Sequence, residues 1–156
     1  VSSAASDVYK RQAVIHGDYH LDNTLASPHE PKILAIIDWE LATVGDPYMD
    51  VALMLMFWGE YRTQQPPAFT ALQSVSRRSG VISRRELAGR WSESVGRPLH
   101  HMNFYMALAF WRLAAIIEGA YGLFVAGQLT TDYARGLEYD VPALLAEAER
   151  AAKGDW

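Results

Sequence analysis

The chain of 156 residues contains no cysteine, which excludes a disulfide framework and any thiol chemistry. It has no excess of basic residues: 14 Lys and Arg stand against 18 Asp and Glu, for a net charge of −4 at pH 7. This balance does not provide the positive surface that nucleic acid requires, so we expect no nucleic-acid partner. A cysteine-free composition also suits a reducing compartment, and we expect a cytoplasmic protein. The sequence also contains no glycine-rich loop of the kind that binds nucleotide phosphates.

Half of the residues are hydrophobic, which is enough to bury the core of one domain. The most apolar stretch, residues 101–125, is predicted to be a single long helix. Arg112 and Glu118 lie near its middle, where charged groups would make a membrane span costly. We therefore expect no membrane partner and assign this helix to the centre of a helical bundle.

One segment near the N-terminus carries the residues of a phosphotransfer site. Asp18 is followed five residues later by Asn23, and Asp38 comes fifteen residues after that. A kinase-type site needs a carboxylate that accepts the proton of a substrate hydroxyl, and oxygen ligands for the magnesium ions on the nucleotide phosphates. The spacing from acid to amide matches the catalytic loop of protein kinases. We therefore predict Asp18 as the catalytic base, and Asn23 and Asp38 as the magnesium ligands.

Short apolar segments around this motif predict the strands that hold it. Residues 13–15 lead into the loop, residues 24–26 leave it, and the run at 33–37 ends directly before Asp38. This last run is apolar throughout and is predicted to be buried. Residues 27–31 contain two prolines and supply the turn between the last two strands. The sequence thus predicts an α+β fold in which a small β-hairpin region carries the active loop and a helical bundle follows.

The rest of the chain is predicted to be helical. Asp46 and Pro47 suit the start of one helix, and Ser83 opens another with a capping box that ends at Glu86. In the first helix Asp50 lies on the apolar side, so its carboxylate needs donors, and we expect it to accept hydrogen bonds from the backbone of the catalytic loop. The predicted helices cover residues 47–58, 68–78, 83–95, 101–125, 130–137 and 141–153.

Taken together, the motifs resemble the aminoglycoside phosphotransferase (APH) family, within the protein-kinase-like fold. The resemblance runs from Val14 to Trp58 and rests on three motifs: H-G-D-x-x-x-x-N at 16–23, I-D-W-E at 37–40, and Gly45-Asp46-Pro47 followed by Asp50. The residues of these motifs are similar to those of a subgroup that also occurs fused to acyl-CoA dehydrogenase domains, in acyl-CoA dehydrogenase family members 10 and 11. A further stretch at 112–117 resembles a later helix of that subgroup.

The resemblance implies a transferase that moves the γ-phosphoryl group of ATP or GTP to a hydroxyl of a small molecule, with Mg²⁺ as its metal. Its closest subgroup points to a hydroxyacyl-CoA or a related hydroxy acid as the acceptor. Residues expected to bind this acceptor are His20, Arg112, Glu118 and Tyr121.

Three residues are expected to support the site. His16 is interpreted as a packed, hydrogen-bonded loop histidine rather than as a catalyst. Asp50 is expected to hold the loop in shape, and Glu40 to contact a second metal or a neighbouring structural group.

Residues 1–12 resemble translated adapter sequence, and we exclude this leader from the predicted domain at 13–156. A kinase-like enzyme also needs an N-terminal lobe with a strand lysine for the phosphates and a hinge for the adenine. Because the segment before His16 is too short for such a lobe, we expect a truncated C-terminal lobe. We expect this lobe to be inactive without the missing N-terminal lobe.

A metal-dependent hydrolase is one alternative. Imidazole and carboxylate side chains alternate with a period of two at His16, Asp18, His20 and Asp22. On a strand they would share one face and could bind zinc or manganese. The glycine at position 17 argues against a regular strand there.

A non-catalytic kinase-like lobe that only binds or scaffolds is the second alternative. The intact set of Asp18, Asn23 and Asp38 argues against such a loss of function.

Overall fold

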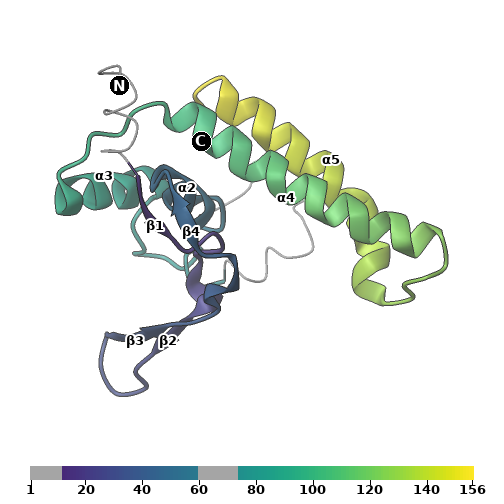
Figure 1. Ribbon diagram of the computed structural model, residues 1–156, viewed down its shortest axis with the longest axis horizontal. Coiled ribbons are helices and arrows are strands. Elements are labelled where there is room, and N and C mark those ends of the chain that lie inside the picture. The colour runs from purple at the N-terminus through teal and green to yellow at the C-terminus, as the bar shows by residue number, and fades with distance from the viewer. Residues whose placement is uncertain (1–11, 60–73) are drawn as a thin grey trace. The chain divides into compact units, whose positions relative to one another are not determined.

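The computed structural model describes residues 12–59 and 74–156 (Figure 1). The chain forms two compact units, residues 1–54 and 55–156, and each is described by itself. The predicted leader, apart from Gln12, and most of the predicted helix at 68–78 lie outside the described residues. Residues 74–78, at the end of that predicted helix, form turns.

Two antiparallel pairs of short strands form the β part of the first unit. Strand β1 (Ala13–Ile15) pairs with β4 (Thr43–Gly45), and β2 (Thr24–Ala26) pairs with β3 (Ile33–Ile36). The predicted strands that become β1, β2 and β3 are confirmed, with β3 one residue shorter than expected. The sequence pattern does not predict β4, because a three-residue strand that ends in glycine carries little strand signal. Its pairing with β1 places the segment after the predicted metal ligand beside the segment before the catalytic loop.

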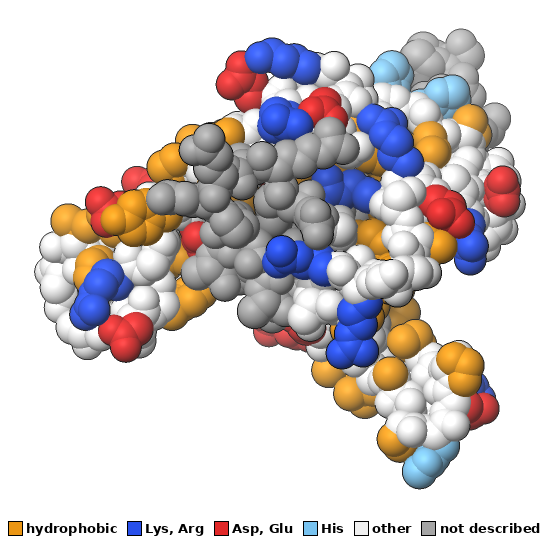
Figure 2. All heavy atoms as spheres, turned by 180° about the vertical axis from the view of Figure 1, so that it is seen from behind, with side chains coloured by type: hydrophobic (Ala, Val, Ile, Leu, Met, Phe, Trp, Pro, Cys, Tyr) orange, Lys and Arg blue, Asp and Glu red, His pale blue; other side chains and the backbone are white. Residues whose placement is uncertain are grey.

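The β2–β3 hairpin exposes its apolar side chains. Ile33 is 50% exposed and Leu34 is 57% exposed, and several hydrophobic side chains are visible at the surface of the hairpin at the lower right of Figure 2. The prediction that this strand is buried is therefore wrong. An apolar run indicates that a strand favours burial, but burial also needs a second layer. In the part of the first unit that the structure describes, no such layer covers these side chains.

Helix α2 (Tyr48–Met56) begins one residue after the predicted start at Pro47 and ends two residues before Trp58. The Asp46 Oδ1 oxygen accepts a hydrogen bond from the Tyr48 amide at 3.1 Å, which satisfies one donor of the first turn. The helix is buried at Val51 and at several further residues, as expected for a core helix. The boundary between the two units falls within α2.

The described part of the second unit contains three further helices: α3 (Arg84–Val95), α4 (Met102–Val125) and α5 (Asp132–Ala152). The predicted cap of α3 is confirmed, because Ser83 Oγ accepts a hydrogen bond from the Glu86 amide at 3.1 Å. Helices α4 and α5 run antiparallel and pack against each other (Figure 1). Their most deeply buried large side chains are Met106, Phe110, Ile117, Leu137 and Leu144.

Helix α5 is continuous where the sequence predicts two helices, at 130–137 and 141–153. Pro142 lies inside it and cannot donate the usual backbone hydrogen bond to the preceding turn. However, Leu137 and Leu144 lie seven residues apart and are both fully buried, so the buried face of the helix continues past the proline. Packing of this face against α4 therefore outweighs the local tendency of proline to end a helix.

Helix α4 is long and apolar enough to cross a membrane by length and composition alone. The core helix of a soluble protein meets the same criterion, and 22% of the most apolar window of α4 is buried. The structure shows this helix packed against α5, as expected of a bundle helix. The expectation that the protein has no membrane partner stays a prediction.

Candidate active site

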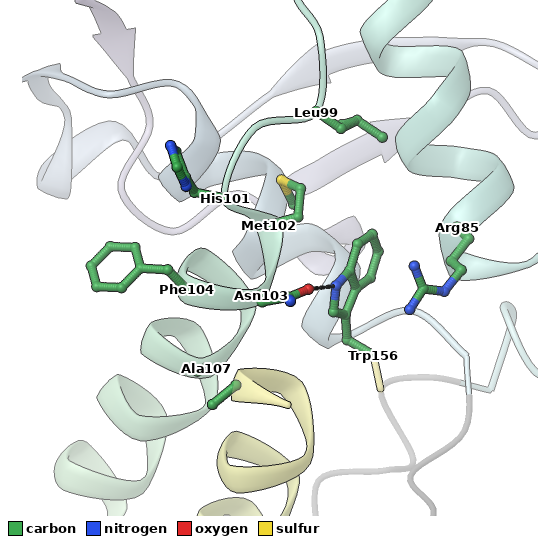
Figure 3. Close-up of a pocket in the computed structure, with 9 residues that line it drawn as sticks. Arg85, Leu99, His101, Met102, Asn103, Phe104, Ala107 and Trp156 are labelled. Carbon is green, nitrogen blue, oxygen red and sulfur yellow. Dashed lines mark hydrogen bonds between the residues drawn. The ribbon is translucent and has the colours of Figure 1, made fainter. Parts of the chain in front are cut away.

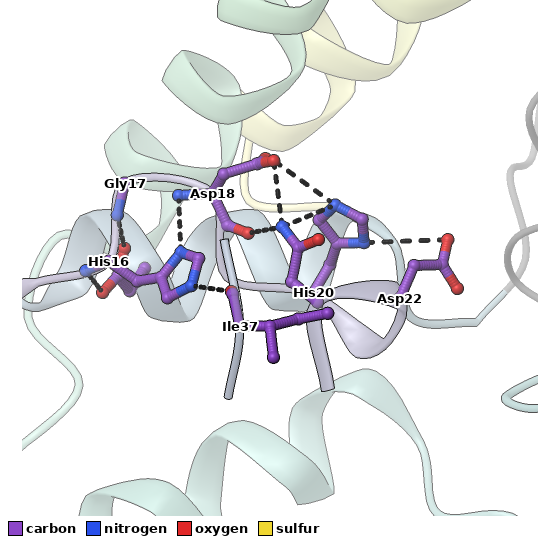
Figure 4. Close-up of polar contacts among 8 residues, drawn as sticks. His16, Gly17, Asp18, His20, Asp22 and Ile37 are labelled. Atoms are coloured by element: carbon purple, nitrogen blue, oxygen red, sulfur yellow. Dashed lines mark hydrogen bonds and ion pairs between the residues drawn. The ribbon is translucent and has the colours of Figure 1, made fainter. Parts of the chain in front are cut away.

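The loop that follows β1 is held by a carboxylate of α2. The Asp50 side chain accepts hydrogen bonds from the backbone amides of His16, at 2.6 Å, and Gly17, at 2.9 Å (Figure 4). Hydrogen bonds to a charged acceptor are shorter and stronger than neutral ones. The predicted contact between Asp50 and the loop backbone is confirmed.

Gly17 occupies a position that other residues could not easily adopt. Its φ angle is +85°, and a Cβ atom built there would lie 2.5 Å from the carbonyl oxygen of Leu41. A side chain would therefore meet both an unfavourable backbone conformation and a backbone clash. Glycine lets the segments around residues 17 and 41 approach this closely.

His16 is a packed, hydrogen-bonded residue, as predicted. It is 3% exposed, and its ring lies 4.7 Å from the ring of Trp39. The Nε2 atom lies 2.8 Å from the carbonyl oxygen of Ile37, and the Nδ1 atom lies 3.3 Å from the amide nitrogen of Asp18. Because a carbonyl only accepts and an amide N–H only donates, the proton of the neutral ring belongs on Nε2. His16 therefore links the backbone of the catalytic loop to the backbone just before Asp38.

Asp18 and Asn23 are joined directly across the loop. The Asn23 Nδ2 group donates to the Asp18 carbonyl oxygen at 2.7 Å and to the Asp18 Oδ2 carboxylate oxygen at 3.1 Å. Asn23 is buried, whereas the side chain of Asp18 is 40% exposed. The buried amide therefore orients a carboxylate that solvent or a substrate can still reach.

The residue before Asp38 is attached through its backbone to both Asn23 and His16. The Ile37 amide donates to the carbonyl oxygen of Asn23 at 2.9 Å, while the Ile37 carbonyl is held by His16. Asp38 itself has φ +64°, in the left-handed region that residues other than glycine rarely occupy. Its exposed side chain makes no capping hydrogen bond to the turn that follows.

The oxygen atoms of this arrangement suit a magnesium ion. Asn23 uses its amide nitrogen on Asp18, so its Oδ1 oxygen is the atom left to face a cation. Asp38 adds a carboxylate that is not engaged in capping. Magnesium prefers oxygen ligands and usually takes one or two carboxylates together with substrate phosphates. The donor set fits the predicted metal, and the assignment of these residues as its ligands stays a prediction.

His20 and Glu40, which are close in sequence to the predicted magnesium ligands, differ in their exposure to solvent. The His20 ring is largely buried, with Nε2 at 3.6 Å from Asp18 Oδ2 and Nδ1 at 3.8 Å from Asp22 Oδ2 (Figure 4). His20 thus lies between two loop carboxylates, one of them the predicted base. Glu40 lies in the short 3₁₀ turn Trp39–Leu41 and is exposed.

The other predicted acceptor residues lie on α4, in the second unit. Arg112 is half-buried, Glu118 is exposed, and the ring of Tyr121 stacks on Phe124 with 6.2 Å between the ring centres. Their predicted role in an acceptor pocket is therefore not tested by the geometry of either unit alone.

The strand required by the hydrolase alternative does not form. The residues between Gly17 and Asn23 make bends and a 3₁₀ turn, so the four alternating side chains do not line one face. His16 is committed to backbone hydrogen bonds. Within residues 12–59 and 74–156, no group of three or more His, Cys, Asp or Glu side chains is arranged to hold a metal ion.

The sequence did not predict a role in the site for Ile37. Ile37 connects Asn23 to His16 through its backbone N–H and carbonyl groups, not through its side chain. No pattern of residue types reports a backbone contact of this kind, so its apolar side chain indicates only a strand. The constraint at position 17 is visible in the sequence, because the motif has a glycine between His16 and Asp18.

A loop with an oriented carboxylate, a neighbouring amide oxygen and a second carboxylate defines the class of a kinase-like phosphotransfer site. Residues 4–80 match the model of the phosphotransferase enzyme family, APH. The resemblance predicted from the sequence is confirmed, and this part of the chain belongs to that family.

Similar proteins agree with this assignment. The chain is 33% identical over 127 residues to acyl-CoA dehydrogenase family member 10 of Mus musculus, and 33% identical over 121 residues to acyl-CoA dehydrogenase family member 11 of Homo sapiens. These matches cover 78% and 76% of this chain, but 11% and 15% of the two relatives. The solved structure of a candidate aminoglycoside phosphotransferase from Ralstonia eutropha JMP134 matches with a TM-score of 0.71 and 30% identity, over 91% of this chain and 43% of that chain.

Proposed function

We propose that this protein takes part in transfer of the γ-phosphoryl group of ATP or GTP to a hydroxyl of a small molecule. The observation that carries the proposal is the backbone of Ile37, whose N–H donates to the Asn23 carbonyl oxygen and whose carbonyl oxygen is hydrogen-bonded to His16 Nε2. This double attachment holds Asp38 beside the loop that carries Asp18. Membership of the phosphotransferase enzyme family supports the same chemistry.

In the proposed mechanism, Asp18 accepts the proton of the acceptor hydroxyl as the oxygen attacks the γ-phosphorus, the bond to the β-phosphate oxygen breaks, and the nucleoside diphosphate leaves. Asn23 donates to one carboxylate oxygen of Asp18 and so fixes its orientation. Asn23 Oδ1 and the Asp38 carboxylate would hold Mg²⁺, which, when bound, neutralises charge on the nucleotide phosphates. Asp50 and His16 act by holding the loop and do not touch the reacting atoms.

The rest of the nucleotide site is proposed to lie on a preceding N-terminal lobe. The protein-kinase arrangement places a phosphate-binding lysine and an adenine hinge there. The match to 43% of the solved relative supports the proposal that a complete enzyme is longer than this C-terminal lobe. We accordingly expect residues 1–156 alone to show no phosphotransfer.

The acceptor is proposed to be a hydroxyacyl-CoA or a related hydroxy acid in the cytoplasm. The support is the similarity to acyl-CoA dehydrogenase family members 10 and 11, whose names refer to acyl-CoA. Candidate residues for holding this acceptor are His20, Arg112, Glu118 and Tyr121.

Metal binding by the chain itself tests the site without requiring turnover. Paramagnetic Mn²⁺ can replace Mg²⁺, and it should broaden the NMR amide signals around Asn23 and Asp38 at low concentration. Asp38→Ala should remove this selective broadening, and Asn23→Ala should weaken it, because each variant lacks one oxygen ligand.

Glu30→Gln is the matched control, because Glu30 is an exposed acid in the β2–β3 turn that pairs with Lys32. It should leave the broadening unchanged. Equal broadening in all variants would show that the metal assignment is wrong.

A further inference from the structure

The second unit contains an open cavity of about 780 Å³ at the start of α4 (Figure 3). Pockets of roughly 300–1,000 Å³ are typical of small-molecule sites. Four parts of the second unit contribute to its walls: α3, the loop before α4, the first turns of α4, and the C-terminal end of the chain. The lining residues are Arg85, Leu99, His101, Met102, Asn103, Phe104, Ala107, Ala152 and Trp156.

Arg85 is held in place on one wall of this cavity. Its guanidinium carbon lies 4.2 Å from the centre of the Trp156 ring, and its Nη2 group donates to the carbonyl oxygen of Gly154 at 2.7 Å. Stacking and one backbone hydrogen bond reduce the freedom of the side chain, while its remaining N–H groups stay available. Among the residues that the structure describes, no carboxylate pairs with Arg85.

Two further polar side chains of the cavity, Asn103 and Trp156, are hydrogen-bonded to each other. The Trp156 indole N–H donates to Asn103 Oδ1 at 2.8 Å (Figure 3). This bond occupies the acceptor end of the Asn103 amide and leaves its NH₂ group. His101 adds an imidazole, and none of the nine lining residues is an acid. The cavity therefore offers positive charge and hydrogen-bond donors, but no side-chain carboxylate to receive a cation.

Most of the remaining wall is apolar. Leu99, Met102 and Phe104 contribute side chains without strong hydrogen-bonding groups, and Ala107 leaves space beside them. We propose that this cavity binds an organic carboxylate that carries an apolar group, with the carboxylate on Arg85 and the apolar group against these side chains. This inference depends only on the second unit and does not rest on the proposed phosphotransfer.

Three probes of equal chain length and different charge test the proposal on the 156-residue chain. Octanoate, octanol and octylammonium can each be titrated while the indole N–H signal of Trp156 is followed by NMR. Trp156→Phe assigns this signal among the five tryptophans. Because only the carboxylate can form an ion pair with arginine and accept two hydrogen bonds from it, octanoate should bind roughly tenfold more tightly than either other probe. If octanol or octylammonium binds as tightly as octanoate, the proposal is wrong.

Two variants test separately the positive charge of Arg85 and the free volume of the cavity. Arg85→Gln should weaken octanoate binding roughly tenfold, because the positive group is lost. Arg90→Gln is its control: Arg90 lies on the same helix but pairs with Glu86 and does not line the cavity. Ala107→Leu should also weaken binding by filling the cavity, although it leaves Arg85 in place. Unchanged octanoate binding in Arg85→Gln or Ala107→Leu would overturn the proposal.

Discussion

The two units of this protein are stabilised by different interactions. In the first unit, the predicted catalytic loop, residues 16–23, is held by hydrogen bonds between backbone groups and the side chains of Asp50, His16 and Asn23. In the second unit, α4 and α5 pack through fully buried apolar side chains such as Phe110 and Leu144. Directional polar contacts fix positions to within a fraction of an ångström, whereas apolar packing is non-directional and mainly supplies stability.

This difference indicates how stability and function are divided. A predicted phosphotransfer site needs a few oxygen atoms in fixed positions, and the first unit provides them while leaving many apolar side chains exposed. The second unit has the deeper core and offers a separate cavity. We therefore expect substitutions in the loop to change rate or local order, and substitutions in the α4–α5 core to change global stability.

The largest expected effect is on rate. In a form of the protein that transfers phosphate, Asp18→Asn should lower kcat roughly 10²–10⁴-fold, because the variant keeps the shape of the side chain but removes the base. The melting temperature should change little, since Asp18 is half-exposed. The control is Asp22→Asn, an exposed acid of the same loop. A variant at Asp18 that melts early but retains its rate would show that the residue is structural.

The next effect is on the helical core. Phe110→Ala should lower the free energy of unfolding by about 3–5 kcal/mol, because it leaves a cavity in the α4–α5 packing. Phe104→Ala makes the same chemical change on the same helix at an exposed position and should cost much less. Urea unfolding followed by circular dichroism measures both. Equal losses would contradict the assignment of Phe110 to the core.

Asp50→Ala should have a smaller effect on stability. Removing this acceptor leaves the His16 and Gly17 amides without the carboxylate that they donate to, at a cost of about 1–3 kcal/mol. Asp50→Asn keeps one acceptor oxygen, so its stability should lie between that of Asp50→Ala and that of the parent. Hydrogen exchange at the two amides is the direct measurement. If exchange there is no faster in Asp50→Ala, the proposed support of the loop is wrong.

The smallest expected effect is a difference in stability between alanine variants at two glycines, one in each unit. Gly17 and Gly59 have φ angles of +85° and +88°, so alanine at either position should cost about 1–2 kcal/mol from backbone conformation alone. Only at position 17 would the new Cβ meet a backbone oxygen, that of Leu41 at 2.5 Å; at position 59 it meets nothing within 4 Å. Gly17→Ala should therefore destabilise more, as thermal melts of both variants can show. Equal losses of thermal stability in the two variants would mean that Leu41 moves away from the new Cβ atom without an energetic cost.

Local signals in the sequence account for the parts of the fold that were predicted correctly. Asp46 and Ser83 accept hydrogen bonds from amides two and three residues further on, so their effect depends on nearby residues only. The same holds for the β2–β3 hairpin, whose turn contains two prolines. Burial of Ile33 and the break predicted near Pro142 were wrong, because both depend on what packs against the segment.

The sequence by itself determined which residues can do the chemistry and where helices begin. The types and spacing of Asp18, Asn23 and Asp38 are properties of the chain, and they predict phosphotransfer-type chemistry before any folding is considered. The conformational freedom needed at position 17 is likewise present in the choice of glycine.

Only the tertiary structure decided how these residues meet. Ile37 joins Asn23 to His16 through backbone atoms that every residue possesses, so no residue pattern could reveal it. The continuity of α5 through Pro142 likewise depends on packing against α4, because the apolar contact with another helix outweighs the one backbone hydrogen bond that proline cannot make. The cavity beside Arg85 brings together residues that are far apart in the chain, which is a consequence of folding alone.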